Sequence, residues 1–249
     1  MVVLGVSLGE SAVYSILRII ERMTRPEPLS AQTSTMNTSA TPDRPWLDLA
    51  YQLANLAFPL VPVLLALYLL WLAAGPPAWP GDDPGVRPWH RMGFDLRRPW
   101  SDLGKGFAVA AGIGIPGLGF YLLAREIGIN TNVAPANLAE NWWTVPVYLL
   151  AAAMNGVLEE VLMLGWLFLR LRQLEWSWAG VVLVSAVVRG SYHFYQGFGG
   201  FAGNLVMGIV FGALFLRWRR VGPLVVAHTL LDVVAFVGYA LVAPHVDWL

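Results

Sequence analysis

One stretch of this chain, residues 142–172, is apolar enough and long enough to cross a lipid bilayer as a helix, for which about 20 residues suffice. Glu159 and Glu160 lie side by side near its middle. A charged side chain at the centre of a membrane helix costs roughly 2.5–3.5 kcal/mol on insertion scales. A helix that only anchors a protein has no use for two such carboxyl groups, so we expect the pair to take part in chemistry.

Composition extends this reading to the whole chain. Of the 249 residues, 57% are hydrophobic and only 13% are charged, whereas soluble domains have about a quarter charged residues. Lys plus Arg and Asp plus Glu number 16 each, so the net charge favours no nucleic-acid partner. Cysteine is absent, which excludes disulfides, thiolate metal ligands and a cysteine nucleophile. We therefore predict an all-α, polytopic integral membrane protein.

Apolar segments separated by polar or turn residues predict about seven transmembrane helices. They form three regions: a marginal first helix with a polar linker (1–46), two helices with a cytoplasmic loop (47–141), and a core of four helices (142–242). Arg and Lys concentrate in the connections after the second, fourth and sixth spans, which predicts that these connections and the N-terminus are cytoplasmic. We also expect the membrane to be the plasma membrane. The predicted spans are residues 2–23, 47–74, 105–124, 142–172, 178–195, 201–216 and 221–242.

Local residues predict two features of these helices. Pro59 and Pro62 predict a kink in the second span, because each proline leaves a carbonyl group without its helical donor. Gly208 and Gly212 lie one turn apart on the sixth span and predict close packing against a neighbouring helix.

Few strongly polar side chains remain inside the spans, and they gather on the last four. Ionisable residues within a membrane usually face the bundle interior and pair with one another, so this clustering predicts one shared polar cavity. We expect the two asparagines to make hydrogen bonds between helices, and His90 and His245 to lie outside the cavity. The clustered residues are Asn155, Glu159, Glu160, Arg189, His193, Asn204, His228 and Asp232.

Helical spacing relates these side chains to one another. His228 and Asp232 are four residues apart, so they share a face about 6 Å apart along the axis. Asn155 lies one turn before Glu159 on the same face. Glu160 points about 100° away from Glu159, so the two glutamates should have different neighbours. One can serve a reaction while the other orients or pairs.

Such a set can hydrolyse an amide bond without a covalent intermediate. A carboxylate beside a neutral histidine can hold and deprotonate a water molecule. Attack of that water on a carbonyl group creates an oxyanion, which imidazole or amide N–H groups stabilise. The same groups could instead bind Zn²⁺ through two histidines and a carboxylate, with the second glutamate as base. In that case His193 and His228 with Glu159 would be the ligands.

The order Glu159-Glu160, His193 and His228-x-x-x-Asp232, each motif on its own predicted helix, resembles the CPBP family of intramembrane proteases, which includes the CAAX prenyl proteases and the Abi proteins. The resemblance covers about residues 142–242. It implies endopeptidase activity in which Glu159 and His193 activate water, and His228 and Asp232 support the oxyanion. It leaves open the choice between a metal-free glutamate mechanism and the metalloprotease mechanism often assigned to the family.

The sequence departs from the family pattern at two positions. The Arg of the first motif falls at Leu164, and the Phe of the second motif falls at Arg189. We therefore hypothesise that the guanidinium has moved to the histidine helix and that Arg189 pairs with Glu160. The third motif ends in Asp; because an Asp must be protonated to donate a hydrogen bond, we expect Asp232 to orient His228 through its imidazole N–H group.

We favour an intramembrane endopeptidase that requires no cofactor, with a Zn²⁺ enzyme as the alternative, and that acts on a membrane-associated or lipidated peptide within the lipid bilayer. Two other functions fit the same residues: a membrane scaffold or immunity factor that has lost catalysis, and a proton- or ion-coupled transporter. The missing first-motif Arg supports the scaffold. Carriers usually show inverted repeats and paired broken helices, and the hydropathy of this sequence has neither.

Overall fold

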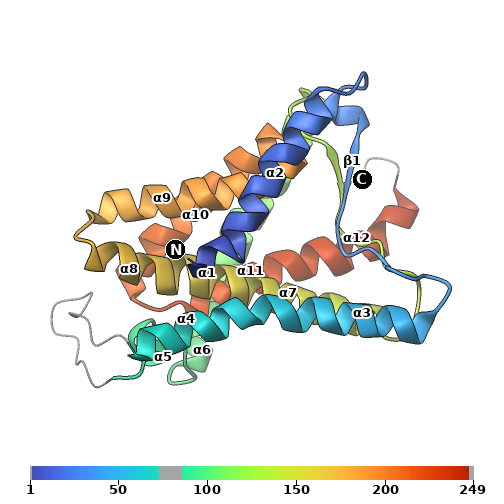
Figure 1. Cartoon of the computed structure of the whole chain (residues 1–249). Helices are drawn as coiled ribbons and strands as arrows, with labels where there is room; N and C mark the ends of the chain where they lie inside the picture. Colours follow the sequence, from blue (N-terminus) through green and yellow to red (C-terminus); the bar gives the residue numbers. More distant parts are fainter. Residues whose placement is uncertain (1, 73–85, 247–249) are drawn as a thin grey trace.

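The computed structural model describes residues 2–72 and 86–246, and most of these residues are helical (Figure 1). The α-helices are α1 (Val2–Gly5), α2 (Leu8–Met23), α3 (Pro45–Ala57), α4 (Val61–Leu72), α5 (Pro88–Arg91), α6 (Pro99–Glu126), α7 (Thr144–Glu160), α8 (Phe168–Gln173), α9 (Trp178–Tyr192), α10 (Phe198–Trp218), α11 (Gly222–Val233) and α12 (Tyr239–Val242). Between them lie the 3₁₀ turns η1 (Leu29–Ala31), η2 (Phe58–Leu60), η4 (Phe194–Gln196) and η6 (Ala243–His245), and the π-helical segments η3 (Val161–Leu167) and η5 (Val234–Gly238). Two short strands, β1 (Thr33–Thr35) and β2 (Asn132–Ala134), pair in parallel.

The predicted all-α, polytopic architecture is confirmed, but the described residues hold six candidate spans and not the seven predicted. Helix α9, which corresponds to the fifth predicted span, is apolar but has only 15 residues and is shorter than a membrane span. Residues 73 and 74 of the second predicted span lie outside the described part of the chain. Six helical segments there are long and apolar enough to cross a bilayer: Val2–Met23, Pro45–Leu72, Pro99–Glu126, Thr144–Gln173, Phe198–Trp218 and Gly222–Val242.

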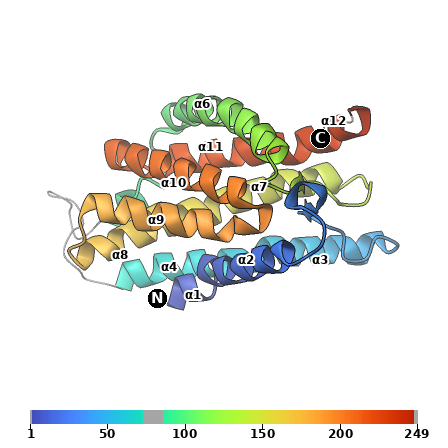
Figure 2. The same cartoon turned by 90° about the horizontal axis from the view of Figure 1, so that it is seen from above.

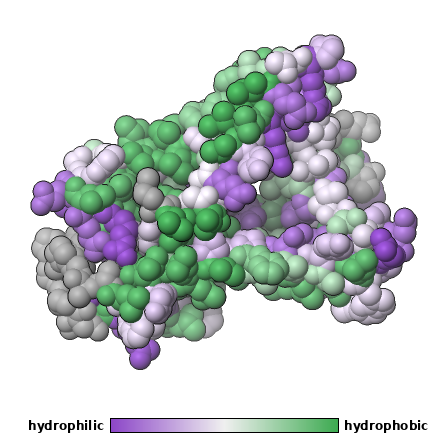
Figure 3. All heavy atoms as spheres, in the orientation of Figure 1, coloured by the Kyte–Doolittle hydropathy of each residue, from purple (hydrophilic) through white to green (hydrophobic). Residues whose placement is uncertain are grey.

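The glutamate-bearing segment lies at the centre of the bundle. In the most apolar part of the Thr144–Gln173 segment 61% is buried inside the protein, whereas in the most apolar part of the Pro99–Glu126 segment only 6% is buried. The outer helices expose large apolar side chains, for example Leu64 on α4 and Ile115 on α6, and much of the surface in Figure 3 is hydrophobic. The carboxyl groups are therefore enclosed by protein, while the apolar exterior suits lipid.

Two of the long segments change their helical geometry along their length. The 3₁₀ turn η2 interrupts the α-helical geometry between α3 and α4 at Pro59, one of the two prolines for which a kink is predicted. In the central segment, α7 ends at Glu160 and the π-helical η3 follows directly. Short π-helical turns occur frequently at functional sites. The change at Glu160 thus marks the place where the site is built.

Glycines allow the last helices to pack closely against their neighbours. Helix α11 packs against α6 and α7, and α9 packs against α10 and α2 (Figure 2). A Cβ atom on Gly208 would lie 2.8 Å from the Cα atom of Ala186, which confirms the predicted close contact of this glycine. A Cβ atom on Gly156 would lie 2.7 Å from Oγ1 of Thr229. Gly156 therefore lets α11 approach α7 one turn before the glutamates.

The polar segment after α2 is a connection, as predicted, but it is held in place. Strand β1 pairs with β2, and the hydroxyl group of Ser34 donates a hydrogen bond to the carbonyl oxygen of Tyr195 at 3.0 Å. Tyr195 in turn donates its backbone N–H to the hydroxyl oxygen of Ser15 on α2 at 2.7 Å. These contacts fix α2 beside the end of α9.

A buried charged cluster connects α6 to the start of α11. Arg220 donates hydrogen bonds to Asp102 at 2.6 Å and to Asp95 at 3.1 Å, and Nδ1 of His90 lies 3.0 Å from Asp95. Burial raises the pKa of Asp95, but hydrogen bonds from the Arg97 backbone, His90 and Arg220 outweigh it and hold the pKa below its usual value. The cluster therefore favours an ionised Asp95. As predicted, His90 takes no part in the intramembrane cavity.

Candidate active site

The two glutamates occupy different surroundings at the end of α7, as the helical spacing predicted. Glu160 is fully buried, and Glu159 retains 9% exposure. Glu160 faces α9 and α11, whereas Glu159 lines a cavity. A deeply buried carboxylate requires partners, and a partly exposed one is able to meet water or substrate.

Glu160 is held by two side chains from other helices. Nη2 of Arg189 on α9 donates a hydrogen bond to Oε1 of Glu160 at 2.6 Å, and Nδ1 of His228 on α11 lies 2.6 Å from the same oxygen. Arg189 is 1% exposed, and the carboxylate of Glu160 neutralises its charge inside the protein. The hypothesis that Arg189 pairs with Glu160 is confirmed.

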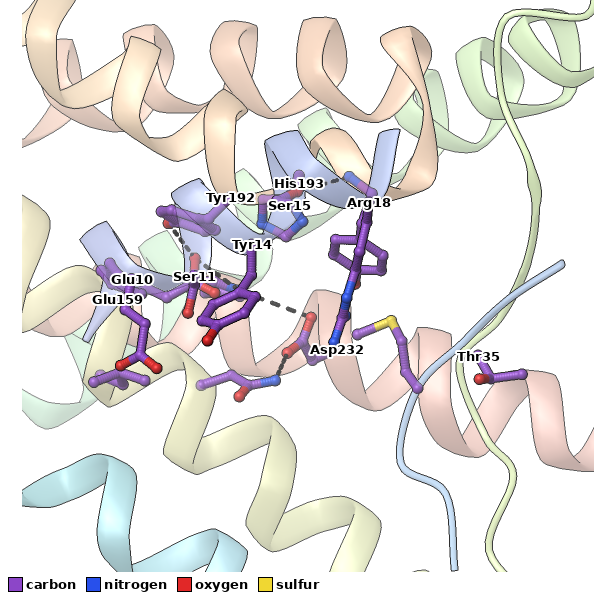
Figure 4. Close-up of a pocket in the computed structure, with 16 residues that line it drawn as sticks. Glu10, Ser11, Tyr14, Ser15, Arg18, Thr35, Glu159, Tyr192, His193 and Asp232 are labelled. Atoms are coloured by element: carbon purple, nitrogen blue, oxygen red, sulfur yellow. Dashed lines mark hydrogen bonds and ion pairs between the residues drawn. The ribbon is translucent and has the colours of Figure 1, made fainter. Parts of the chain in front are cut away.

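Among the described residues, Glu159 accepts one hydrogen bond, and the side chains of Arg189 and His228 lie nearby. The hydroxyl group of Tyr192 donates to Oε2 of Glu159 at 2.6 Å, and Figure 4 shows both residues at the cavity. Nη1 of Arg189 and Nε2 of His228 lie 3.6 and 4.0 Å from the same oxygen. The other carboxylate oxygen, Oε1, has no such contact among the described residues, so it is open to a ligand in the cavity.

The expected role of Asp232 is wrong. Nε2 of His228 lies 3.8 Å from Oδ1 of Asp232, which is too long for a hydrogen bond. Asp232 instead accepts a hydrogen bond from the side-chain amide of Asn155 at 2.9 Å, the contact between helices expected for that asparagine. The carboxylate that orients His228 is Glu160. Helix spacing places His228 and Asp232 on one face, but the close approach at Gly156 brings Glu160 nearer.

His193 stands apart from these contacts. It caps the C-terminal end of α9, and its ring lies 4.9 Å from the Tyr192 ring. Neither ring nitrogen has a hydrogen-bond partner within the described ranges, although both atoms are buried. A buried polar atom without a protein partner is costly, and a site that holds water or a substrate amide accounts for it. His193 and Glu159 line the same cavity.

The cavity has a volume of about 440 Å³ and joins residues far apart in the sequence. Figure 3 shows the surface hollowed beside α2, with hydrophilic atoms at the back of the hollow. Glu159, His193, His228 and Asp232 line it, whereas Asn204 donates to the Gly200 carbonyl within α10. Helix α2 contributes Leu8, Glu10, Ser11, Tyr14, Ser15 and Arg18 (Figure 4).

The wall formed by α2 is the part of the site that the sequence reasoning missed. The signal was present, because Glu10, Tyr14 and Arg18 follow each other at intervals of four residues and so share one helix face. Glu10 and Arg18 also interrupt an otherwise apolar segment. The sequence leaves the role of Tyr192 open, because a tyrosine beside the histidine is equally typical of an interfacial anchor.

The residues that come together as a possible metal site differ from those expected. Ligand atoms of Glu159, Glu160 and His228 lie within 4.8 Å of one another, and His193 is not in this group among the described residues. The group suits a divalent cation poorly. Arg189 already places a guanidinium against both carboxylates, and the shared oxygen of Glu160 contacts Arg189 and His228. A metal ion there would face an adjacent positive charge.

Comparison with known proteins identifies one family. Residues 141–234 match the family described as type II CAAX prenyl endopeptidase Rce1-like. No curated protein and no solved structure matches the chain significantly. The matched residues include all five predicted site residues and Arg189, whereas α2 lies outside them. The resemblance to the CPBP and CAAX proteases is thereby confirmed.

Proposed function

Because this integral membrane protein contains an Rce1-like domain of the CAAX endopeptidase type, we propose that it hydrolyses peptide bonds within the membrane by means of a water molecule activated by Glu159 and His193. The observation that carries the proposal is the pairing of a cavity-facing carboxylate with a histidine whose two nitrogens have no partner among the described residues. This combination is able to hold a water molecule and accept its proton.

In the proposed reaction Glu159 takes one proton from the water, and the oxygen attacks the carbonyl carbon of the scissile bond. The carbonyl oxygen becomes an oxyanion. The bond between carbon and nitrogen then breaks, and Glu159 returns its proton to the leaving nitrogen. A new carboxyl group and a new amine result, and Glu159 is again a carboxylate.

His228 is suited to stabilise the oxyanion. Its Nδ1 atom lies 2.6 Å from Glu160, which fixes the ring and leaves Nε2 on the side of Glu159 and Asp232. Carrying a proton, Nε2 donates a hydrogen bond to the oxyanion. Asp232 and Asn155 hydrogen-bond to each other in the wall of the cavity and make no hydrogen bond to the His228 ring. In this proposal Glu160 and Arg189 position the reacting groups without touching the substrate.

The proposal requires no metal ion, because the Arg189 guanidinium supplies the positive charge beside the carboxylates. The substrate is proposed to be a membrane-associated or lipidated peptide, since the cavity opens on a chain whose exterior is apolar. The charge distribution supports a cytoplasmic N-terminus, and we propose that the protein resides in the plasma membrane. The pairing of Arg189 with Glu160 supports the catalytic proposal over an inactive scaffold, because it supplies a guanidinium in place of the arginine missing at Leu164.

Proteolysis of a peptide library by the purified, detergent-solubilised protein tests the proposal. The comparison is between the unaltered protein, Glu159→Gln and the control Glu140→Gln, whose glutamate is exposed in the connection before α7. We expect cleavage by the unaltered protein and by Glu140→Gln only. A folded protein that cleaves nothing but moves protons or ions across liposomes would favour the transporter, and cleavage by Glu159→Gln would contradict the assigned base.

A further inference from the structure

The ring of His193 has no hydrogen bond that fixes its orientation. Both ring nitrogens are buried, and neither has a hydrogen-bond partner in the part of the chain that the structure describes. A histidine that acts in catalysis is often oriented by a hydrogen bond on its second nitrogen. The ring instead lies beside the rings of Tyr192 and Tyr195, which are close neighbours in the chain. The position of His193 at the cavity (Figure 4) therefore depends on the backbone that carries these residues.

The backbone after His193 forms an irregular turn and does not continue the helix. Helix α9 ends at Tyr192, and the 3₁₀ turn η4 occupies Phe194–Gln196. Gly197 follows with a φ angle of +118°, a conformation that residues with a side chain rarely adopt. Backbone polar groups of such a turn lack helical partners and must find others. Contacts from elsewhere in the chain therefore decide the shape of this turn.

Thr131, directly before β2, holds the turn through two donors on one carbonyl group. Its backbone N–H and its hydroxyl group both donate to the carbonyl oxygen of Gln196, at 2.8 and 2.9 Å. Thr131 is fully buried, and the hydroxyl oxygen of Ser34 on β1 lies 2.8 Å from that of Thr131. The carbonyl group three residues after His193 is thus attached to the paired strands.

Asn130 holds the other end of the same turn. Its Oδ1 atom accepts a hydrogen bond from the backbone N–H of Gly200 at 2.7 Å, and its side-chain amide donates to the Thr131 carbonyl oxygen at 3.1 Å. A Cβ atom on Gly197 would lie 2.8 Å from the Cα atom of Asn130, so the two backbones are in direct contact. Asn130 is 2% exposed. The segment that follows His193 is therefore held at both ends by two adjacent buried residues.

We infer that Thr131 and Asn130 are positioning residues that place His193 in the cavity beside Glu159; this inference rests on the proposed endopeptidase function. Neither residue is among the described residues that line the cavity, so both act through the backbone of the turn. Both also lie outside residues 141–234, the range that matches the family. The matched region carries His193, and the connection before it keeps that histidine in place.

Thr131→Val, which replaces the hydroxyl group by a methyl group, tests the assignment through steady-state kinetics on one peptide. We expect kcat to fall by about 10–100-fold, because a displacement of about 1 Å is able to cost about 100-fold in rate, while KM stays nearly unchanged. Thr131→Ser keeps the hydroxyl group and should retain most of the kcat value. If Thr131→Val does not fold, Ser34→Ala takes its place, and kcat should again fall without a change in KM.

The matched control is Thr144→Val. The hydroxyl group of Thr144 also donates to a backbone carbonyl, that of Ala139 at 2.8 Å, but Thr144 makes no contact with the turn after His193 among the described residues. This variant should keep kcat. Equal losses of kcat in the two valine variants would show that Thr131 serves only the stability of the fold. That result, or full kcat in a folded Thr131→Val or Ser34→Ala variant, would overturn the inference.

Nuclear magnetic resonance of the histidine rings separates this inference from the proposed function, because it needs no cleavage. The chain has four histidines, and the variant His193→Gln identifies the signals of His193 in protein labelled with isotopic histidine. Thr131→Val should shift the His193 ring signals and leave those of His228 in place, whereas Thr144→Val should shift neither. Shifted His193 signals support the positioning role even if the protein cleaves no peptide. Unchanged His193 signals would overturn it, whether or not Glu159 acts as the base.

Discussion

Arg189 on α9 donates a hydrogen bond to Glu160 on α7 at 2.6 Å, with both side chains at least 99% buried. The family pattern places its arginine at the position of Leu164, one turn after Glu160 on the same helix segment. Here the guanidinium reaches the glutamate from a different helix. The charge of the carboxylate is thus neutralised in the membrane although the motif is altered.

Replacing Arg189 by Leu should remove activity and destabilise the fold. Breaking a buried ion pair by deleting one partner typically costs about 3–5 kcal/mol, because the other charge stays buried without compensation. Thermal unfolding and peptide cleavage are the measurements. The double variant Arg189→Leu with Glu160→Gln should regain stability without activity. A single variant with full expression and full activity would disprove the role of this pair.

Tyr192→Phe should lower kcat by about tenfold or more and leave KM nearly unchanged. Its hydroxyl group donates to Glu159 at 2.6 Å, and a hydrogen bond to a charged group contributes about 1.5–3 kcal/mol. The control is Tyr51→Phe, which alters an exposed tyrosine on α3. Steady-state kinetics on one peptide decide the matter: equal kcat values for the two variants would show that the Tyr192 contact does not serve the reaction.

Asp232→Asn should keep most of the activity, whereas His228→Ala should lose it. Asp232 accepts a hydrogen bond from Asn155, and an asparagine carbonyl oxygen is able to accept the same bond. Its distance of 3.8 Å from Nε2 of His228 gives it no hydrogen bond to the ring. Cleavage rates of the two variants should differ by at least about tenfold; equal losses would restore the idea that Asp232 orients His228.

Acid should weaken the cluster around Arg220. The pKa of Asp95 in the folded protein is held below its usual value of 3.8, so this carboxylate stabilises the fold above that value, and the contribution is lost as the pH falls through the depressed folded pKa. Tm should therefore fall more steeply below about pH 4 in the unaltered protein than in Asp95→Asn. Parallel Tm curves for the two proteins would contradict the contribution of Asp95.

Periodic and short-range features were predictable from the sequence. Length and apolarity predicted the membrane helices, and the missing arginine predicted the Arg189 pair. Each of these features follows either from the residues of a single helix or from the requirement that a buried charge has a partner of opposite charge. Glu159 and Glu160 were also correctly separated, because adjacent residues on a helix point about 100° apart.

Contacts between helices were harder to predict. Spacing on α11 suggested that Asp232 orients His228, but the approach of α11 to α7 at Gly156 brings Glu160 to the ring instead. The position of α2 over the cavity depends on contacts of Ser15 and Ser34 with the Tyr195 backbone. Such long-range hydrogen bonds leave no periodic pattern in the sequence. The polar face of α2 is therefore visible in the sequence, whereas its position over the cavity is not.

The central claim is that Glu159 activates the attacking water without a metal ion. Its most direct test is the rate of cleavage of one peptide by the unaltered protein and by Glu159→Gln, each with and without a chelator. We predict a loss of about 10²–10⁴-fold in Glu159→Gln, the range typical of general-base catalysis, and no effect of the chelator on the unaltered protein. A chelator-sensitive rate restored by Zn²⁺, or a Glu159→Gln variant that cleaves at the normal rate, would contradict the account.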